Sequence, residues 1–470
     1  MSVDFIKADR ETPFLFPPSV QDWLPQDHLA RFVVDIVGQL NLSSLRAVYA
    51  GKGSRPYDPA MLLSLILYGY ATSVFSSRKL EQATYDSVAF RYIAGNQHPD
   101  HDTIATFRQR FSPELQGLFV QVLSIASEMG VLKLGRVSLD GTKVKANASK
   151  HQALSWQHAC KLEEQLQREV EHLWQLAEEA DQSAIPDGMS ISAELERREK
   201  RLATIAEAKR KIEARAAERD AEQQQASEKK LADRKQKEKQ SSKKNKGKPA
   251  KPQKPGPRPK DQVNLTDEES RIMPASGGGF TQGFNAQACV DVATLLIIVA
   301  QTTQQVNDKQ QIKPAIKELD KLRGQLGRVE ELIADSGYFS QANVEACETA
   351  GMTPFIAVSR EEHNQRLEDR LSKPEPVARD ADSVTRMKHR LKTKAGKEVY
   401  GQRKCTVEPV FGIIKSVLGY NQFLRRGLEN VKAEWKLVSL AWNLKRMHVL
   451  SKPSRKNLVM AGLDQSIGAF

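Results

Sequence analysis

Residues 136–146 have the sequence RVSLDGTKVKA, and this stretch decides how the rest of the chain is interpreted. Val137, Leu139 and Val144 stand among polar residues in the alternating pattern of a β-strand. The stretch also carries one acidic side chain, Asp140, in apolar surroundings. Asp-Gly is a common hairpin turn, so Asp140 is either a turn residue or a functional carboxylate, and the stretch alone leaves both open.

Two more carboxylates stand in comparable places. Asp335 ends the apolar part of VEELIADSGYF, and Glu408 lies in TVEPVFGIIK, where a helix is expected to begin with Thr406 as its N-cap. Singly, Asp335 is equally compatible with a plain turn, and Glu408 with a favourable place at a helix N-terminus. Carboxylates are costly to hold together without a cation, so the three together indicate a magnesium site.

The segments around these residues predict a mixed sheet flanked by helices. Asp308 is expected to be the N-cap of a helix rather than a metal ligand. The expected strands cover about residues 281–290, 295–302, 329–335 and 352–359, and the expected helices cover 308–323, 340–350 and 406–450.

A long insertion follows the first strand. Apolar residues at helical spacing predict an antiparallel helical hairpin over residues 158–235. Residues 236–264 are rich in Lys, Pro and Gly and are expected to form a disordered basic linker. Because Lys229–Lys260 holds 14 basic and 2 acidic residues, nearly all of the chain's net charge of +13 lies in this segment.

The N-terminal residues 1–130 predict a helical domain, and residues 451–470 are expected to be a C-terminal tail. Asp58 and Pro59 favour the start of one helix, and Asp102 is expected to cap a short helix that carries Arg108 and Arg110. These two arginines are candidate DNA-binding residues, but helical packing without DNA explains the segment equally well. The two His and two Asp within residues 98–102 are interpreted as a polar loop rather than a metal site.

Charge and composition narrow the class of protein. Residues 386–404 hold 8 basic and 1 acidic residue, and residues 415–456 hold 10 and 2. With the basic insertion, these stretches favour a polyanion as partner. We expect no membrane helix, because no apolar run approaches 18 residues, and a cytoplasmic location, because the four cysteines are scattered and no signal peptide is visible.

Three motifs together resemble a known family. LDGTKVKANAS (139–149), ADSGYF (334–339) and the pattern Y-x2-R-x4-E-x6-K look like the catalytic blocks of DDE transposases of bacterial insertion sequences. The most similar group is the insertion-sequence-1182-like one, related to the insertion sequence 4 and 5 families. PYDPAMLLSLILYGY (56–70) and HPDHDTIATFRQRF (98–111) are similar to that group's helical N-terminal domain.

This resemblance implies a ribonuclease-H-like core over residues 131–157 and 265–450, interrupted by the hairpin. Asp140 would lie on the first strand, Asp335 after the fourth and Glu408 on the helix after the fifth. These three would be catalytic and would bind two Mg²⁺ ions, with Mn²⁺ as a substitute.

The third motif is formed by Tyr400, Arg403, Glu408 and Lys415. Of these, Tyr400, Arg403 and Lys415 would contact DNA. The related families usually place three residues between Arg and Glu, whereas four intervene here, and Lys404 fits the shorter spacing. Glu408 and Lys415 lie seven residues apart, so in a regular helix they would share a face.

The implied protein is a transposase that binds terminal inverted repeats, cleaves double-stranded DNA and catalyses strand transfer. It would act as a homodimer on DNA, near the nucleoid and away from membranes. Two alternatives stay open: a ribonuclease-H-like nuclease without strand transfer, and a non-catalytic DNA-binding protein.

Deleting residues 229–260 is expected to flatten the dependence of DNA affinity on salt, because each phosphate contact contributes about 0.9 to the slope of log K against log salt. Fluorescence anisotropy between about 50 and 200 mM salt measures the slope. The control is a neutral Gly/Ser segment of equal length, which should behave like the deletion. An unchanged slope would contradict the interpretation.

Overall fold

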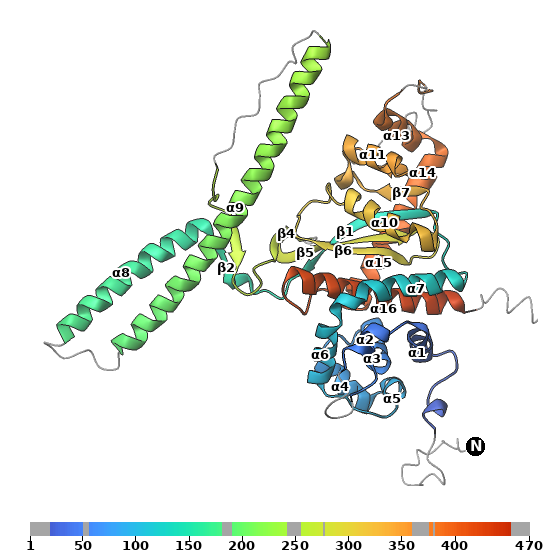
Figure 1. Ribbon diagram of the computed structural model, residues 1–470, viewed down its shortest axis with the longest axis horizontal. Coiled ribbons are helices and arrows are strands. Elements are labelled where there is room, and N and C mark those ends of the chain that lie inside the picture. Colours follow the sequence, from blue (N-terminus) through green and yellow to red (C-terminus); the bar gives the residue numbers. More distant parts are fainter. Residues whose placement is uncertain are drawn as a thin grey trace, which may run out of the picture. The chain divides into compact units, whose positions relative to one another are not determined.

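The computed structural model describes residues 19–49, 56–180, 190–241, 255–275, 278–359, 376–378 and 381–452 (Figure 1). The chain divides into two compact units: Met1–Lys145 together with Phe284–Phe470, and Ala146–Gly283. The insertion after the first strand therefore folds as a unit of its own. Within the described ranges, no helix combines the length and the apolar character needed to cross a bilayer.

The N-terminal part of the first unit is helical, as predicted. Helix α3 begins as expected, with Pro59 at its first position and the Asp58 side chain accepting a hydrogen bond from the Ala60 N–H (3.1 Å). The predicted cap of α6 was wrong, because Asp100 rather than Asp102 accepts from the Thr103 N–H (2.7 Å). The helices are α1 (Leu29–Gln39), α2 (Ser43–Ala47), α3 (Pro59–Ala71), α4 (Ser77–Asp86), α5 (Val88–Ala94), α6 (His101–Arg110) and α7 (Leu115–Glu128).

A mixed sheet forms the centre of the same unit, which confirms the predicted mixed α/β architecture. Its strands lie in the order β6-β5-β1-β7-β8, and the first part of β5 also pairs with β4 (Arg271–Pro274). Strands β5 and β6 are antiparallel, whereas β7 is parallel to both β1 and β8. The strands are β1 (Arg136–Lys145), β5 (Phe280–Asp291), β6 (Ile297–Thr303), β7 (Glu331–Ala334) and β8 (Thr353–Ile356).

Helix α16 (Leu428–Ser451) packs against both the sheet and the N-terminal helices. It contacts β6, α7 and α3, and Figure 1 shows it running beside α7. The Trp435 indole donates to the Gln287 carbonyl (3.0 Å), and the Asn443 amide accepts from the N–H and donates to the C=O of Ile297 (both 2.8 Å). The remaining helices are α10 (Ile312–Leu326), α11 (Gln341–Thr349), α13 (Ser383–Lys392), α14 (Lys394–Gly401) and α15 (Arg403–Gly412).

The second unit contains the predicted hairpin, formed by α8 (Trp156–Ala180) and α9 (Ile191–Ser241). The two helices are antiparallel, because Glu163 pairs with Lys209 (2.6 Å) whereas Glu169 pairs with the earlier Arg198 (2.8 Å). The buried cluster that the two helices share is apolar and includes Ala159 and Leu166 on α8 and Ile205, Ala208 and Ile212 on α9. Strand β2 (Ala153–Ser155) pairs with β3 (Gln262–Asn264), and β4 is Arg271–Pro274.

The expected basic linker, 236–264, is only partly described. The middle of this segment, residues 242–254, lies outside the described residues. Before them α9 continues to Ser241. Its last part is rich in Lys, Glu, Gln and Ala, which are all good helix formers, so its high charge does not prevent a helix. After them the chain folds against α9, since Asp220 accepts from the Gly256 N–H (2.6 Å) and Arg219 pairs with Asp261 (2.7 Å). Both ends of the expected linker therefore belong to the folded insertion.

Replacing Asn443 with Ala is expected to lower the free energy of unfolding by about 2–4 kcal/mol. The change leaves the buried N–H and C=O of Ile297 without their amide partner. Urea unfolding followed by tryptophan fluorescence measures the effect. Glu429→Ala, at an exposed position on the same helix, is the control and should cost less than about 0.5 kcal/mol. Equal losses in both variants would show that the amide pair is unimportant.

Candidate active site beside strands β1 and β7

Two of the three predicted carboxylates lie at neighbouring positions of two paired strands. In the parallel register of β1 and β7, Leu139 pairs with Ala334. Asp140 and Asp335 are the next residues on the two strands. Asp335 ends its strand, where its side chain accepts a hydrogen bond from the Gly337 N–H (2.9 Å). The strand pairing alone therefore brings two acidic residues 195 positions apart into one place.

The third carboxylate is linked to the first by an arginine. Arg403 donates from Nη1 to Asp140 Oδ2 (3.1 Å) and from Nη2 to Glu408 Oε1 (2.7 Å). Burial lowers the pKa of Arg403, but Asp140 and then Glu408 and Tyr400 outweigh this effect and raise it. The four-residue spacing between Arg403 and Glu408 thus still permits the arginine to reach both acids.

The predicted start of the helix that carries Glu408 was wrong. Helix α15 begins at Arg403, so Glu408 lies in its middle and Pro409 lies inside it rather than in the first turn. Thr406 is not the N-cap, because its hydroxyl donates to the Gln402 carbonyl (2.7 Å) one turn earlier. The earlier start places Arg403 and Glu408 on one helix.

Asp140 is an unusual carboxylate because its side chain is only 16% exposed. Its pKa is raised to about 7, mainly by burial and also by Asp335 and Asp308, although the Gly141 N–H and Arg403 lower it. The negative charges here outweigh the positive charge that Arg403 supplies. The site is therefore electrostatically prepared for an additional cation.

The donor set was tested against the divalent metal that the resemblance implies. Asp140, Asp335 and Glu408 offer only carboxylate oxygens, the donors that Mg²⁺ and Mn²⁺ prefer. No three His, Cys, Asp or Glu side chains are already grouped to hold a metal ion in the part of the chain that the structure describes. Instead Arg403 bridges two of the acids. The donor chemistry and the raised pKa of Asp140 fit a divalent cation, with Arg403 as the neutralising group in its absence.

Sequence analysis missed a polar network beside Asp140. Asp308 was predicted to cap a helix, but α10 begins later and is preceded by Gln311. The Asp308 Oδ1 atom accepts from Asn285 Nδ2 and Gln287 Nε2 (both 2.7 Å), and Lys143 Nζ lies 3.2 Å away. Two amides at alternate positions of an otherwise apolar strand were the signal that could have identified this network.

Gly141 is required by this network. A Cβ atom at this position would lie 2.2 Å from Gln287 Nε2 and 2.7 Å from Asp308 Oδ1, which is too close for any side chain. Strand β1 also continues through Asp140 and Gly141 to Lys145, so the Asp-Gly pair is not a hairpin turn. The interpretation of Asp140 as a hairpin-turn residue is therefore excluded.

Lys415 lies near the same strand, although not as predicted. It belongs to the π-helical turn η5 (Ile413–Val417) that follows α15, and this wider turn breaks the spacing by which it would share a face with Glu408. Its Nζ donates to the Lys143 carbonyl (2.7 Å). Burial, and then the nearby Lys143, lower the pKa of Lys415.

The two candidate DNA-binding arginines of α6 have different surroundings. Arg108 turns into the helical domain, where it donates to the Tyr70 hydroxyl (3.2 Å) and the Phe75 carbonyl (3.1 Å). Arg110 is exposed, with its guanidinium 5.9 Å from the centre of the Tyr49 ring. Only Arg110 therefore keeps its charge at the surface without a hydrogen-bonded partner among the contacts described for it.

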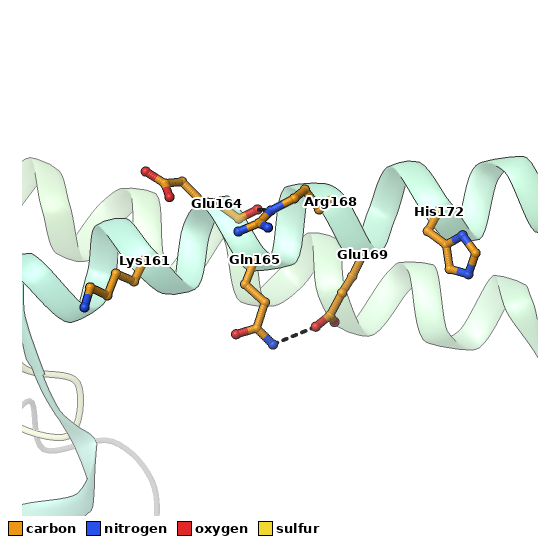
Figure 2. Close-up of a pocket in the computed structure, with 6 residues that line it drawn as sticks. All are labelled: Lys161, Glu164, Gln165, Arg168, Glu169 and His172. Atoms are coloured by element: carbon orange, nitrogen blue, oxygen red, sulfur yellow. Dashed lines mark hydrogen bonds between the residues drawn. The ribbon is translucent and has the colours of Figure 1, made fainter.

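Two further places give no candidate site. His98 stacks on Tyr85 at 3.9 Å, and His101 lies 2.7 Å from Glu81, so the histidines of residues 98–102 have structural partners. A surface depression of about 510 Å³ lies on α8, and Figure 2 shows its lining side chains along that single helix. It is the solvated face of the hairpin rather than an enclosed cavity.

Comparison with known proteins gives two matches. Residues 251–444 match the family model described as a transposase DDE domain, and residues 18–110 match the one described as a transposase domain (DUF772). The first match contains Asp335 and Glu408 but begins after Asp140, whose assignment depends on the geometry. Neither a curated protein nor a solved structure matches the chain.

Replacing Asp140 with Asn is expected to change how stability depends on pH. The folded-state pKa of Asp140, about 7, lies above the ordinary aspartate value of 3.8, so ionisation destabilises the folded protein as the pH rises between these values. Asn cannot ionise. The unfolding free energy of Asp140→Asn relative to the unchanged protein should therefore rise from pH 5 to pH 8, by on the order of 1–3 kcal/mol.

Urea unfolding in EDTA at both pH values tests this expectation. Asp320→Asn, at an exposed position on α10, is the control and should give a difference that does not vary with pH. A pH-independent difference for Asp140→Asn would contradict the raised pKa.

Proposed function

Since both matched domains support a DDE transposase of insertion sequences, we propose that this chain binds the terminal inverted repeats of its element, cleaves the DNA there and joins the freed 3′-hydroxyl to target DNA. One observation carries the proposal: the pairing of Leu139 with Ala334 puts Asp140 next to Asp335, while Arg403 joins Asp140 to Glu408. Residues from three distant segments thus supply three carboxylates in one neighbourhood.

The strand order supports a ribonuclease-H-like core. Along the chain, the strands of the first unit's sheet are β1, β5, β6, β7 and β8. Asp140 lies on the first of them, Asp335 follows the fourth, and Glu408 lies on a helix after the fifth. This is the placement that the resemblance implies for the three catalytic residues.

In this proposal Asp140, Asp335 and Glu408 hold two Mg²⁺ ions, for which Mn²⁺ can substitute. Such ions help to activate the attacking oxygen and to stabilise the leaving oxygen in phosphoryl transfer. The protein's own contribution is to hold the carboxylates close together despite their repulsion. The pKa of Asp140 is raised mainly by its burial, with a smaller contribution from the charge of Asp335.

Arg403 has two roles in the proposal. In the metal-free protein it neutralises Asp140 and Glu408. Its planar guanidinium has five donors whose geometry also suits phosphate. Once the acids bind cations, we expect Arg403 to turn its donors to the DNA backbone, with Tyr400 nearby on α14.

DNA recognition is assigned to the helical domain and the basic segments. Arg110 is the exposed basic residue of α6, whereas Arg108 supports that helix from inside. The insertion's basic run adds affinity without sequence choice. Because an element has two ends and each requires a reaction centre, we propose a homodimer on DNA.

Asp335→Asn is expected to abolish cleavage and leave DNA binding nearly unchanged, because the change removes one metal-binding charge and keeps the side chain's size. The substrate is the DNA that borders the element, incubated with purified protein and Mg²⁺. Cuts are mapped on denaturing gels, and joining is followed with a supercoiled plasmid as target. Binding is measured in parallel in EDTA.

Asp320→Asn, an exposed acid-to-amide change on α10, is the matched control and should cleave normally. Normal cleavage by Asp335→Asn would exclude the proposed site. Cleavage without joining by the unchanged protein would favour a nuclease over a transposase. Binding with neither cleavage nor joining, at any Mg²⁺ or Mn²⁺ concentration, would favour a non-catalytic DNA-binding protein.

A further inference from the structure

We propose that Lys143 and Lys415 form a seat for one DNA phosphate beside the three carboxylates, and that Asp308 is the positioning residue that holds Lys143 in place. The inference rests on the proposed function, because it assigns a substrate contact to the same site. It concerns residues that the catalytic motif does not include, apart from Lys415.

Lys143 stands three residues beyond Asp140 on β1, with its side chain 18% exposed. Its Nζ atom lies 3.2 and 3.5 Å from the two oxygens of Asp308. A tight charge-assisted bond is shorter, at about 2.7–2.9 Å. An ammonium group has three N–H donors. The loose pair with Asp308 therefore leaves Lys143 able to donate to a second anion.

Lys415 brings a second positive charge to the same strand. Its Nζ donates to the backbone carbonyl of Lys143 (2.7 Å), and no carboxylate pairs with it among the described residues. The two lysines are close enough for Lys143 to lower the pKa of Lys415. The Lys415 ammonium group thus lies against the backbone of Lys143, and a phosphate bound at this part of β1 would be stabilised by both positive charges.

Asp308 is fixed rather than free. Asn285 and Gln287, which donate to it, are 0% and 1% exposed. Each amide has another partner: Asn285 Nδ2 also donates to the Gln305 carbonyl (3.1 Å), and Gln287 Oε1 accepts from the Tyr338 hydroxyl. A buried network with all these bonds made specifies one geometry.

The network also indicates what Asp308 does. Its Oδ1 atom already accepts from two amides, so it is poorly placed to act as a fourth metal ligand. Its remaining interaction is with Lys143. Because Tyr338 follows Asp335 by three residues, the same network connects the seat to the turn that carries a catalytic carboxylate.

The test measures the coupling between Lys143 and single phosphates. Duplexes of the element's terminal repeat carry one uncharged methylphosphonate at successive positions around the cleavage site. Affinity for the full-length protein is measured by fluorescence anisotropy in EDTA. At one position the neutral group should weaken binding by the unchanged protein about tenfold. For Lys143→Gln, the loss at that position should be less than about twofold, because the contact is already absent.

Lys145→Gln is the matched control, since it removes the same charge from an exposed residue two positions along the same strand. It should keep the tenfold sensitivity, and Lys143→Arg should restore it. Asp308→Asn should reduce the sensitivity although Lys143 is present. A merely structural Asp308 would lower the melting temperature and leave the sensitivity unchanged.

If Lys143→Gln loses as much affinity as the unchanged protein at every methylphosphonate position, the phosphate seat is overturned. This holds even if cleavage depends on Asp335, as the proposed function requires. If circular dichroism shows that Lys143→Gln does not fold, the same measurement is made on Asp308→Asn. A loss of affinity below about twofold at the sensitive position then supports the seat, and a loss of about tenfold overturns it. Absence of repeat binding and of cleavage by the unchanged protein would instead overturn the proposed function, and the seat with it.

Discussion

The repulsion between carboxylates at neighbouring positions of two parallel strands is the constraint on which the site depends. Strand pairing makes Asp140 and Asp335 neighbours, and neither can move away without breaking the β1–β7 register. The surrounding residues reduce the cost in different ways. Arg403 bridges Asp140 to Glu408, and Lys143 and two amides surround Asp308. The pKa of Asp140 is nevertheless raised, mainly by burial and to a lesser extent by Asp335 and Asp308.

Local patterns predicted the elements well, because they depend on residues close in sequence. The strand around Asp140, the Asp58 cap of α3 and the antiparallel hairpin were all predictable in this way. The cap of α6 shows the limit of this method, since Asp100 and Asp102 both suit a helix start and only the backbone geometry distinguishes them. Helix α15 likewise begins three residues before the expected cap.

The relations within the candidate site were harder to predict, because they join distant segments. The side chain of Asp308 is oriented by amides more than 20 positions earlier in the chain. Charge counts have a similar weakness, because they take no account of partners. Arg108 was predicted to bind DNA and Lys415 belongs to a basic stretch, yet each donates to a group inside its own unit. Thus the sequence predicted which carboxylates matter, but not which cations accompany them.

The long insertion has a consequence for how the chain folds. Strand β1 ends at Lys145 and its neighbour in the sheet, β5, begins only at Phe280. Direct pairing of such distant segments is slow, because a long loop must close before any contact compensates for its lost entropy. Inside the insertion, however, Ala153 pairs with Asn264, and the hairpin between them has its own apolar core. If the insertion folds first, its own pairing brings the end of β1 close to the start of β5. Only a short loop then remains to be closed, so the folded hairpin should speed the formation of the sheet that carries the carboxylates.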